Sequence, residues 1–285
     1  SPVAAGAWPG SWERRTMADR LVNEVGALLR EAASRAILPL FRRLGDADVA
    51  EKAPGELVTV ADRRSEEIID AGLRRILPGS VVVGEEQAAA DPSVLDLLRD
   101  PAEVWVVDPL DGTANFAAGR QPFAVMVALR RAGSTRIGWI LDPITDTLLV
   151  GQAGGGAYRD GLAVRTSPDP LEPEALRGAA PTRFLPATLR ERIREGGRRL
   201  GGLLPGLHCA GREYADILAG HQHFALFWRT LPWDHLPGAL LLQEAGGVVR
   251  RLDGSAYDPT DGRSGLLAAA NEQIWRTVHA TLVAR

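Results

Sequence analysis

The segment WVVDPLDGTANF, residues 105–116, runs an apolar stretch directly into two aspartates. The apolar stretch is typical of a buried strand, and Pro109 predicts a tight bend between Asp108 and Asp111. Two unit charges about 4 Å apart repel by about 4 kcal/mol at an effective dielectric constant of about 20. A turn or a helix cap explains most isolated Asp-Gly pairs, but two carboxylates that face a common centre beside a buried strand favour a bound cation, which relieves their repulsion.

The residue types at this corner indicate a particular chemistry. Oxygen ligands without nitrogen or sulfur favour a hard cation such as Mg²⁺ or Mn²⁺ over zinc. The residues that follow, Gly112 to Ala114, predict the start of a short helix whose free N–H groups form an anion-binding site. A metal site beside an anion-binding site favours a phosphate ester as the substrate.

Length and composition exclude several other classes of protein. The 285 residues are enough to bury the core of one large domain or of two packed lobes, and 45% of them are hydrophobic. A net charge of −3 argues against a nucleic-acid partner and against a basic membrane-binding face. No apolar run reaches the length of about 18 to 20 residues that a membrane helix needs. Cys209 is the single cysteine, so no internal disulfide forms, and we expect a cytoplasmic protein.

The first part of the chain predicts an α+β lobe over residues 17–167, which carries the metal-binding segment. We expect residues 1–16 to be a disordered extension, with Met17 as the natural start. Helical spacing of apolar residues predicts the helices, and short apolar runs predict the strands, the last three of which form an antiparallel meander. The predicted helices cover residues 17–43 and 61–77, and the strands lie near residues 80–86, 102–112, 123–131, 135–142 and 146–152.

A proline-rich connector, PDPLEPEAL, follows Ser167 and marks the predicted boundary between two lobes. Residues 168–285 then alternate between strands and helices, which predicts an α/β lobe with a mainly parallel sheet that closes the site. The predicted strands lie near residues 177–181, 222–228, 247–252 and 265–270, and the helices lie near residues 187–200, 211–219 and 234–245 and from residue 272 onward.

Four segments together resemble the motifs of the inositol monophosphatase family, the magnesium-dependent, lithium-sensitive phosphatases. WVVDPLDGTANF is similar to the family signature, and LVTVAD, VVVGEE and PWDHLPGALLLQEAGG occur around it in the family's order. The resemblance runs from about Met17 to the C-terminus, and four ordered motifs are far more specific than one. It implies the α/β (α+β) fold class, as a layered α-β-α-β-α sandwich of the inositol monophosphatase and fructose-1,6-bisphosphatase type.

The resemblance also implies a site with two or three Mg²⁺ ions, for which Mn²⁺ could substitute. Glu85, Asp108 and the carbonyl of Leu110 would hold the first ion. Asp108, Asp111 and Asp234 would hold the second, and the latter two would also face the substrate. Glu85 would border a third, weaker ion position and counts among the catalytic residues.

The same resemblance assigns the remaining roles at the site. Thr113, with Asp62, would orient the attacking water and help to deprotonate it. The backbone N–H groups of Gly112, Thr113 and Ala114 would bind the phosphate. Lys52 is the only lysine of the chain and lies in a loop before the metal residues, where it would be near the phosphate.

Several of these residues also have an ordinary structural explanation. Glu86 could take the place of Glu85 as a ligand. Asp62 could cap the second predicted helix, and Asp234 suits a helix start, where an acid is favoured by the helix dipole. Lys52 could be a solvated loop residue.

The residues around the substrate depart from the family pattern. Family members that act on inositol phosphates commonly carry an acid seven positions before the aspartate of the last motif, where it binds a ring hydroxyl, and this position is Phe227 here. A phenyl ring cannot accept that hydrogen bond, which would cost about 1–3 kcal/mol. Arg212 and Glu213 either face the pocket, with Glu213 as a substrate-binding residue, or form a solvated pair.

We therefore predict a phosphoric monoester hydrolase that uses Mg²⁺ and a metal-activated water to cleave a small phosphorylated metabolite, such as an inositol phosphate or a related sugar or alcohol phosphate. Histidinol phosphate, fructose 1,6-bisphosphate and 3'-phosphoadenosine nucleotides are alternative substrates within the family. The alternative class is a noncatalytic regulatory or binding protein on the same fold. The resemblance further implies a homodimer and inhibition by lithium and by excess magnesium.

Overall fold

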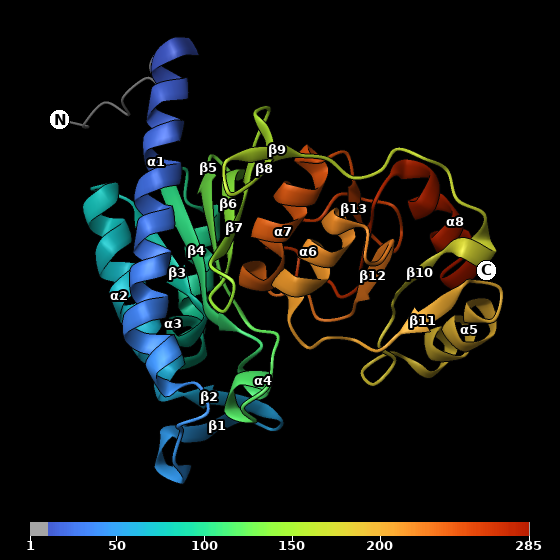
Figure 1. Cartoon of the computed structure of the whole chain (residues 1–285), viewed down its shortest axis with the longest axis horizontal. Coiled ribbons are helices and arrows are strands. Elements are labelled where there is room, and N and C mark those ends of the chain that lie inside the picture. Colours follow the sequence, from blue (N-terminus) through green and yellow to red (C-terminus); the bar gives the residue numbers. More distant parts are fainter. Residues whose placement is uncertain (1–10, 285) are drawn as a thin grey trace.

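The computed structural model describes residues 11–284, which form alternating layers of helices and sheets (Figure 1). Helices α1 and α2 cover one face of a seven-stranded sheet, α6 and α7 lie between this sheet and a five-stranded sheet, and α5 and α8 cover the far side. The predicted layered α-β-α-β-α sandwich is therefore confirmed. The helices of these layers are α1 (Ser11–Ala32), α2 (Val60–Ile76), α5 (Ala187–Gly197), α6 (Ala210–Ala219), α7 (Pro232–Glu244) and α8 (Glu272–Leu282).

Helix α1 both begins and ends earlier than the sequence predicts. It includes residues 11–16, so the predicted disordered extension is wrong for those residues, and residues 1–10 lie outside the described part of the chain. The helix gives way to η1 (Ala33–Ile37) and η2 (Leu38–Leu40) instead of continuing to residue 43. Pro39 accounts for this end because it lacks the N–H group that a further α-helical turn needs.

The seven-stranded sheet has its strands in chain order, from β3 to β9. Its strands are β3 (Val81–Gly84), β4 (Glu103–Asp111), β5 (Ala124–Arg131), β6 (Ser134–Asp142), β7 (Thr147–Gln152), β8 (Gly156–Arg159) and β9 (Leu162–Val164). Strands β3 and β4 are parallel, and all later neighbours are antiparallel, which confirms the predicted meander. The connections carry η3 (Asp46–Asp48), α3 (Glu85–Ala90), η4 (Pro92–Arg99), α4 (Thr113–Ala117) and a separate hairpin of β1 (Val49–Ala53) and β2 (Glu56–Thr59).

The five-stranded sheet has the order β11-β10-β12-β14-β13. Its strands are β10 (Arg177–Ala179), β11 (Gly202–Leu204), β12 (Phe224–Phe227), β13 (Val248–Arg251) and β14 (Leu266–Ala269), and η5 (Pro173–Ala175) precedes β10. The prediction of a mainly parallel sheet is wrong, because β14 is antiparallel to both of its neighbours. No helix lies between β13 and β14, so the chain returns beside the strand that it has just left, as antiparallel neighbours do.

Helix α7 lies between the two sheets and carries Asp234 in its first turn. Its side chains are buried around most of its circumference. A Cβ atom on Gly151 of β7 would lie 2.6 Å from the Cα of Leu241, and one on Gly138 of β6 would lie 2.8 Å from the Cα of Pro237. The two glycines therefore let α7 pack directly on the seven-stranded sheet. Within residues 11–284, no helix is both long enough and apolar enough to cross a membrane.

Candidate active site

Strand β4 ends at the corner that the sequence singles out. Asp108 and Asp111 are 1% and 8% exposed, and the pairing of β4 with β5 is irregular between them. In a regular strand, residues three positions apart point to opposite faces, so this irregularity lets both carboxylates approach one centre. The bend at Pro109 is held on both sides, because Leu110 N donates to Asp108 Oδ1 over 3.0 Å and Ser65 Oγ donates to the Pro109 carbonyl over 2.9 Å.

Four carboxylates from separate parts of the chain lie close enough to change one another's ionisation. Glu85 begins α3, Asp108 and Asp111 end β4, and Asp234 lies at the start of α7. Burial raises the pKa of Asp108 well above its ordinary value, and the nearby charges of the other three carboxylates raise it further. Burial and the charges of Asp111 and Glu85 likewise raise the pKa of Asp234 well above its ordinary value. The four side chains that the motifs predict as metal ligands thus lie within electrostatic reach of one another.

The donor atoms at this corner fit a hard divalent cation. Carboxylate and carbonyl oxygens are the ligands that Mg²⁺ and Mn²⁺ prefer, and a cation would relieve the repulsion between these buried acids. Within residues 11–284, no group of three or more His, Cys, Asp or Glu side chains is arranged so that it could hold a metal ion. The donor atoms are thus of the chemical type that the predicted ions prefer, but the arrangement of these atoms around an ion stays a prediction.

Lys52, on strand β1, lies at the edge of the carboxylate cluster. Its Nζ is 2.6 Å from Glu85 Oε1 and 2.7 Å from Glu86 Oε1, and its side chain is only 14% exposed. Burial disfavours the charged ammonium, but the ion pairs with Glu85 and Glu86 outweigh this effect and hold the pKa of Lys52 above its ordinary value. The alternative of a solvated loop lysine is therefore wrong. The ion pairs also show that both glutamates face this side of the cluster.

Thr113 connects the corner to helix α2. Its hydroxyl lies 2.8 Å from Asp62 Oδ1 and 2.9 Å from the Leu110 carbonyl oxygen, so it can donate to one of them at a time. Asp62 is fully buried, and its Oδ2 accepts hydrogen bonds from the amide and the hydroxyl of Thr59. Burial raises the pKa of Asp62, although these hydrogen bonds oppose the shift. Asp62 therefore caps α2, which is the ordinary structural role predicted for it as an alternative. It also contacts Thr113.

Helix α2 supplies two supporting residues that the sequence analysis did not single out. Glu66 is 5% exposed, and its carboxylate accepts the backbone N–H groups of residues 86 and 87, each over 2.9 Å, at the start of α3. Burial raises the pKa of Glu66 to about 7, against the effect of these hydrogen bonds. Ser65 is fully buried where it holds the β4 bend. The available signal was the spacing of Asp62, Ser65 and Glu66, which puts three polar residues on one face of a helix.

Gly112 separates the corner from helix α4. Its φ of +87° is one that side chains rarely adopt, and a Cβ atom there would lie 2.9 Å from the Pro122 carbonyl oxygen. The N–H groups of Thr113 and Ala114 open the helix, where N–H groups have no acceptor within the helix itself. Glycine at this position therefore allows the turn that presents these N–H groups beside the carboxylates.

Asp111 is held by the first turn of helix α6. Gly211 N donates to Asp111 Oδ2 over 2.7 Å, and the Cys209 thiol donates to the same oxygen over 3.2 Å. Burial raises the pKa of Asp111 to about 6, although these two hydrogen bonds oppose the shift. Burial also raises the pKa of the Cys209 thiol well above its ordinary value, so it remains a donor. Cys209 entered the sequence predictions only as the reason that no internal disulfide forms, and no local pattern pointed to its contact with Asp111.

Glu213 and Arg212 do not join the predicted site residues. The Glu213 carboxylate is 4% exposed and accepts hydrogen bonds from Leu207 N over 2.7 Å and from Gln222 Nε2 over 2.6 Å. Both of its oxygens therefore hold α6 to the neighbouring segments, and the prediction that Glu213 binds substrate has no support from these contacts. Arg212 pairs with Asp216 one turn along the same helix over 2.7 Å, so the alternative of a solvated pair with Glu213 is also wrong.

Phe227 belongs to an aromatic cluster beside Asp234. Its ring is half-buried, stacks on Tyr214 with centroids 5.3 Å apart and meets the His235 ring at 4.7 Å. Because His235 Nε2 lies 3.0 Å from the Arg229 carbonyl, it must donate there, and Nδ1 accepts from the Tyr214 hydroxyl over 3.1 Å. Burial lowers the pKa of His235 to about 4, so the ring is neutral at physiological pH. Phe227 is thus part of an apolar wall, at the position where family members that act on inositol phosphates commonly carry an acid.

Comparisons with known proteins identify the family that the chain resembles over nearly its whole length. The sequence model of the inositol monophosphatase family matches residues 14–285 of the chain. The inositol-1-monophosphatase of Mesorhizobium japonicum is 35% identical over 263 residues, which cover 87% of this chain and 92% of that protein. The Nus factor SuhB of Pseudomonas aeruginosa is 33% identical over 256 residues, which cover 88% of this chain and 92% of that protein.

Solved structures share the fold over nearly the whole chain. The extragenic suppressor protein suhB from Bartonella henselae has a TM-score of 0.74 at 24% identity and covers 94% of this chain and 98% of its own. The inositol monophosphatase of Thermotoga maritima has a TM-score of 0.75 at 24% identity and covers 92% of this chain and 98% of its own. Both similarities extend across the two sheets described above, and both concern the fold.

Proposed function

The chain belongs to the inositol monophosphatase family of phosphoric monoester hydrolases, and we propose that it hydrolyses a small phosphate monoester to an alcohol and inorganic phosphate in the presence of Mg²⁺. Members of this family are metal-dependent phosphatases that act on small phosphorylated substrates. One observation carries the proposal: the charges of Glu85, Asp111 and Asp234 act on the buried Asp108, close to the corner where Thr113 donates a hydrogen bond to Asp62.

The metal ligands that we propose all supply oxygen. Two or three Mg²⁺ ions, or Mn²⁺ ions in their place, would be held by Glu85, Asp108, Asp111 and Asp234 and by the carbonyl of Leu110. Such ions supply, when bound, an acidified water molecule and neutralisation of the charge that develops on the leaving oxygen. The raised pKa values of the acids support this assignment, because a bound cation is what stabilises their charged forms.

The groups of the chain itself would handle the proton of the attacking water. Asp62 Oδ1 accepts the Thr113 hydroxyl proton, so Thr113 Oγ1 can in turn accept a proton from the water. The Leu110 carbonyl is the second acceptor within reach and keeps the hydroxyl oriented once Asp62 carries a proton. Orientation of the nucleophile and stabilisation of charge are most of what in-line phosphoryl transfer needs from a protein.

The phosphate would lie between the N–H groups of Gly112, Thr113 and Ala114 and the ammonium of Lys52. The charge of Lys52 is already committed to Glu85 at 2.6 Å, so the phosphate would add a second partner on the same ammonium. The alcohol part of the substrate would lie toward Phe227. An aromatic ring there favours an alcohol with an apolar face over a polyol, because a polyol hydroxyl at that point would lose its hydrogen bond.

The experiment that tests the function measures phosphate release from a panel of monoesters. The panel includes inositol 1-phosphate, histidinol phosphate, fructose 1,6-bisphosphate, 3'-phosphoadenosine 5'-phosphate and phenyl phosphate. Each ester is measured with Mg²⁺, with Mn²⁺ and with an excess of chelator. We expect release from at least one ester that stops when the metal is chelated. Release that continues at the same rate under chelation would contradict the proposed metal mechanism.

The family also supports proposals about conditions and assembly. We propose inhibition by lithium and by excess magnesium, a homodimer and a cytoplasmic location. Lithium titration of the phosphate-release assay and the mass of the protein in solution test the first two of these. A full-length monomer that remains active at high dilution would contradict the homodimer.

A second candidate is a regulatory or binding role on the same fold, alone or beside catalysis. The observation that favours it is the 33% identity to a protein named Nus factor SuhB. The phosphate-release panel separates the two candidates. A folded protein that releases no phosphate from any ester in the presence of Mg²⁺ would favour the binding role.

A further inference from the structure

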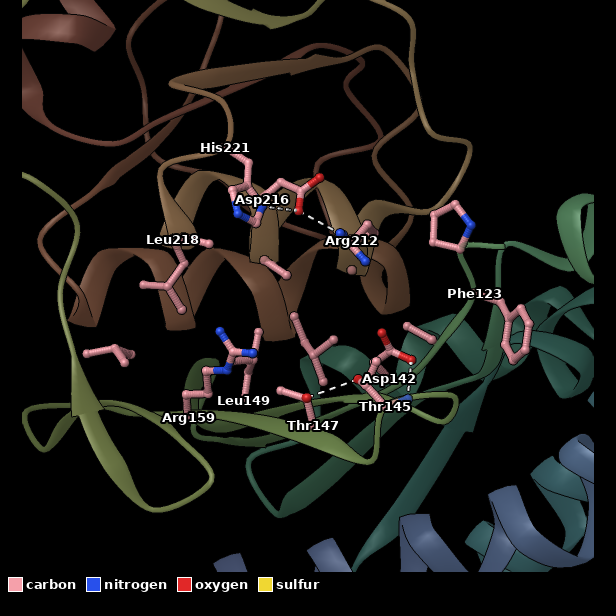
Figure 2. Close-up of a pocket in the computed structure, with 17 residues that line it drawn as sticks. Phe123, Asp142, Thr145, Thr147, Leu149, Arg159, Arg212, Asp216, Leu218 and His221 are labelled. Carbon is pink, nitrogen blue, oxygen red and sulfur yellow. Dashed lines mark hydrogen bonds and ion pairs between the residues drawn. The ribbon is translucent and has the colours of Figure 1, made fainter. Parts of the chain in front are cut away.

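A cavity of about 270 Å³ lies between helix α6 and strands β6 to β8, outside the carboxylate cluster (Figure 2). Its apolar surface includes Ile140, Leu149 and Leu218, and its polar groups include Arg159 on β8 and Arg212 on α6. Small-molecule sites usually have volumes of about 300–1,000 Å³. This cavity lies just below that range, so it suits a ligand with a single ring and not a nucleotide.

The charges around the cavity leave one cation without a partner. Arg212 pairs with Asp216 over 2.7 Å, and Asp142 Oδ1 accepts the N–H groups of residues 144 and 145 over 2.9 and 3.2 Å. The Arg159 side chain rises from β8 toward the cavity, as Figure 2 shows. Among the side chains that the structure describes, its guanidinium has no hydrogen-bond or ion-pair partner. Asp216 is thus paired with a cation and Asp142 is held by backbone N–H groups, whereas the exposed guanidinium of Arg159 has no partner within residues 11–284 and is free to bind an anionic ligand.

The cavity shares a wall with the carboxylate cluster. Gly211 lines the cavity, and its N–H group donates to Asp111 Oδ2 over 2.7 Å. A Cβ atom on Gly211 would lie 3.1 Å from Ile140 Cγ2 and 3.2 Å from Ala124 Cβ, so the first turn of α6 is packed tightly onto the sheet. A ligand that presses on α6 therefore acts on the segment that holds a proposed metal ligand, because close-packed interiors transmit such displacements.

We propose that this cavity is a regulatory site for a small organic anion with an apolar ring, of which an aromatic carboxylate is the simplest form. Arg159 binds the carboxylate, and Ile140, Leu149 and Leu218 contact the ring. Occupancy changes the affinity of the carboxylate cluster for divalent ions through Gly211 and Asp111. This coupling rests on the proposed function, whereas binding of the anion to the cavity is independent of it.

The binding test uses benzoate as the probe, with benzamide and acetate as matched compounds that lack the charge or the ring. Calorimetry with the full chain is expected to detect benzoate and neither of the others. Arg159→Gln should weaken benzoate binding about tenfold, the loss expected for one charge-assisted hydrogen bond. Arg136→Gln is the matched control, because Arg136 is an exposed arginine of the same sheet outside the cavity. Ala215→Leu, which fills the cavity from α6, should abolish binding.

The coupling test measures Mn²⁺ affinity by electron paramagnetic resonance with and without saturating benzoate. We expect a change of Mn²⁺ affinity that disappears in Arg159→Gln, together with the reciprocal change of benzoate affinity when Mn²⁺ is present. Absence of benzoate binding, or equal binding to the wild type and Arg159→Gln, would overturn the site whatever the phosphatase activity. Binding without any change of Mn²⁺ affinity would overturn the regulatory role. Intact binding in a protein without phosphatase activity would instead overturn the proposed function alone.

Discussion

In the half of the molecule built on the seven-stranded sheet, several buried polar side chains converge on one corner, whereas in the half built on the five-stranded sheet most of them hold their own elements together. Asp62 contacts Thr113, and Ser65 holds the Pro109 carbonyl. In the other half, Glu213 holds Gln222 and Leu207. Polar groups that stabilise an element from within contribute nothing to a reaction, so the chemistry depends mainly on the first half.

Asp234 and Cys209 are exceptions in the second half, and the surroundings of Asp234 show what that half adds. The carboxylate meets the other acids, but the side chains next to it are the aromatic rings of Phe227, Tyr214 and His235. In the site that we propose, one half would present charges and hydrogen-bonding groups to the phosphate, and the other would present one carboxylate and an apolar wall. This division would allow the alcohol group of the substrate to change without disturbing the groups that act on the phosphate.

The largest expected effect comes from Asp108→Asn, which tests whether the corner is chemical or merely structural. We expect kcat/KM to fall by about 10³-fold or more, because a proposed bridging ligand loses its charge. The chain should stay folded, since the substitution preserves shape and removes one of several mutually repelling acids. Phosphate release and thermal unfolding measure the two effects. Near-normal turnover in a folded variant would refute the assignment.

Thr113→Val tests the proton path separately from the metal ligands. Valine keeps the shape of the side chain but lacks the hydroxyl that contacts Asp62, so we expect kcat to fall by about 10²-fold, within the range for general acid–base catalysis. Thr113→Ser retains the hydroxyl and should keep most of the activity. Mn²⁺ affinity should be unchanged in both variants. A loss of metal affinity in Thr113→Val would show that the residue acts through the ligands instead.

Phe227→Glu would give the second half the polar group that it lacks. An acid at this position can accept a hydrogen bond from a polyol, so the ratio of kcat/KM for inositol 1-phosphate to that for phenyl phosphate should rise about tenfold. The matched control is Phe227→Leu, which removes the stacking on Tyr214 without adding an acceptor. A change of the ratio in Phe227→Leu as large as that in Phe227→Glu would mean that the wall acts by shape and not by hydrogen bonding.

The outline of the first half could be predicted from the sequence because its signals are local. Acidic residues that follow short apolar runs, such as Asp108, indicate where the strands end. The resemblance to the family then assigns a role to each of the four motifs. The pairing of residues within the predicted meander follows from short connections. The corner is therefore readable from a few neighbouring residues.

The contacts that join distant segments were not predictable in the same way. Cys209 contacts Asp111 across 98 positions, and no local pattern connects the two. Glu213 is acidic and close to a motif, yet its burial against Gln222 depends on how α6 packs. The position of β14 between β12 and β13 depends on how the sheet assembles, and alternation of helices and strands does not specify that order. Tertiary packing decides all three.

Cys209→Ala tests the contact between the two halves at Asp111. Removal of the thiol takes away one of the donors to Asp111 Oδ2 and leaves the N–H group of Gly211 in place. Loss of a residue that hydrogen-bonds to a metal ligand typically lowers metal affinity by about 10- to 100-fold. Because a thiol is a weak donor, we expect Mn²⁺ affinity to fall by about tenfold or less. Mn²⁺ titration measures it. Cys209→Ser, which keeps a donor, should restore the affinity, and equal values for both variants would contradict a role for the hydrogen bond.

The smallest effect is expected at His223, a half-buried polar group that holds only the second half together. Its Nδ1 accepts the Arg177 N–H group over 3.0 Å, and burial, with the charge of Arg177, lowers its pKa below the ordinary value. The folded state therefore binds fewer protons than the unfolded state, so this stabilisation is complete above about pH 6.5 and is lost as the pH falls toward the folded pKa. His223→Asn keeps an acceptor that does not titrate. Its free energy of unfolding in urea should fall less than that of the wild type between about pH 7 and about pH 5, with unchanged turnover at neutral pH, since the contact stabilises the sheet and does not serve the reaction. Equal pH dependence in the two proteins, or a loss of turnover in the variant, would break the distinction between the two halves at this residue.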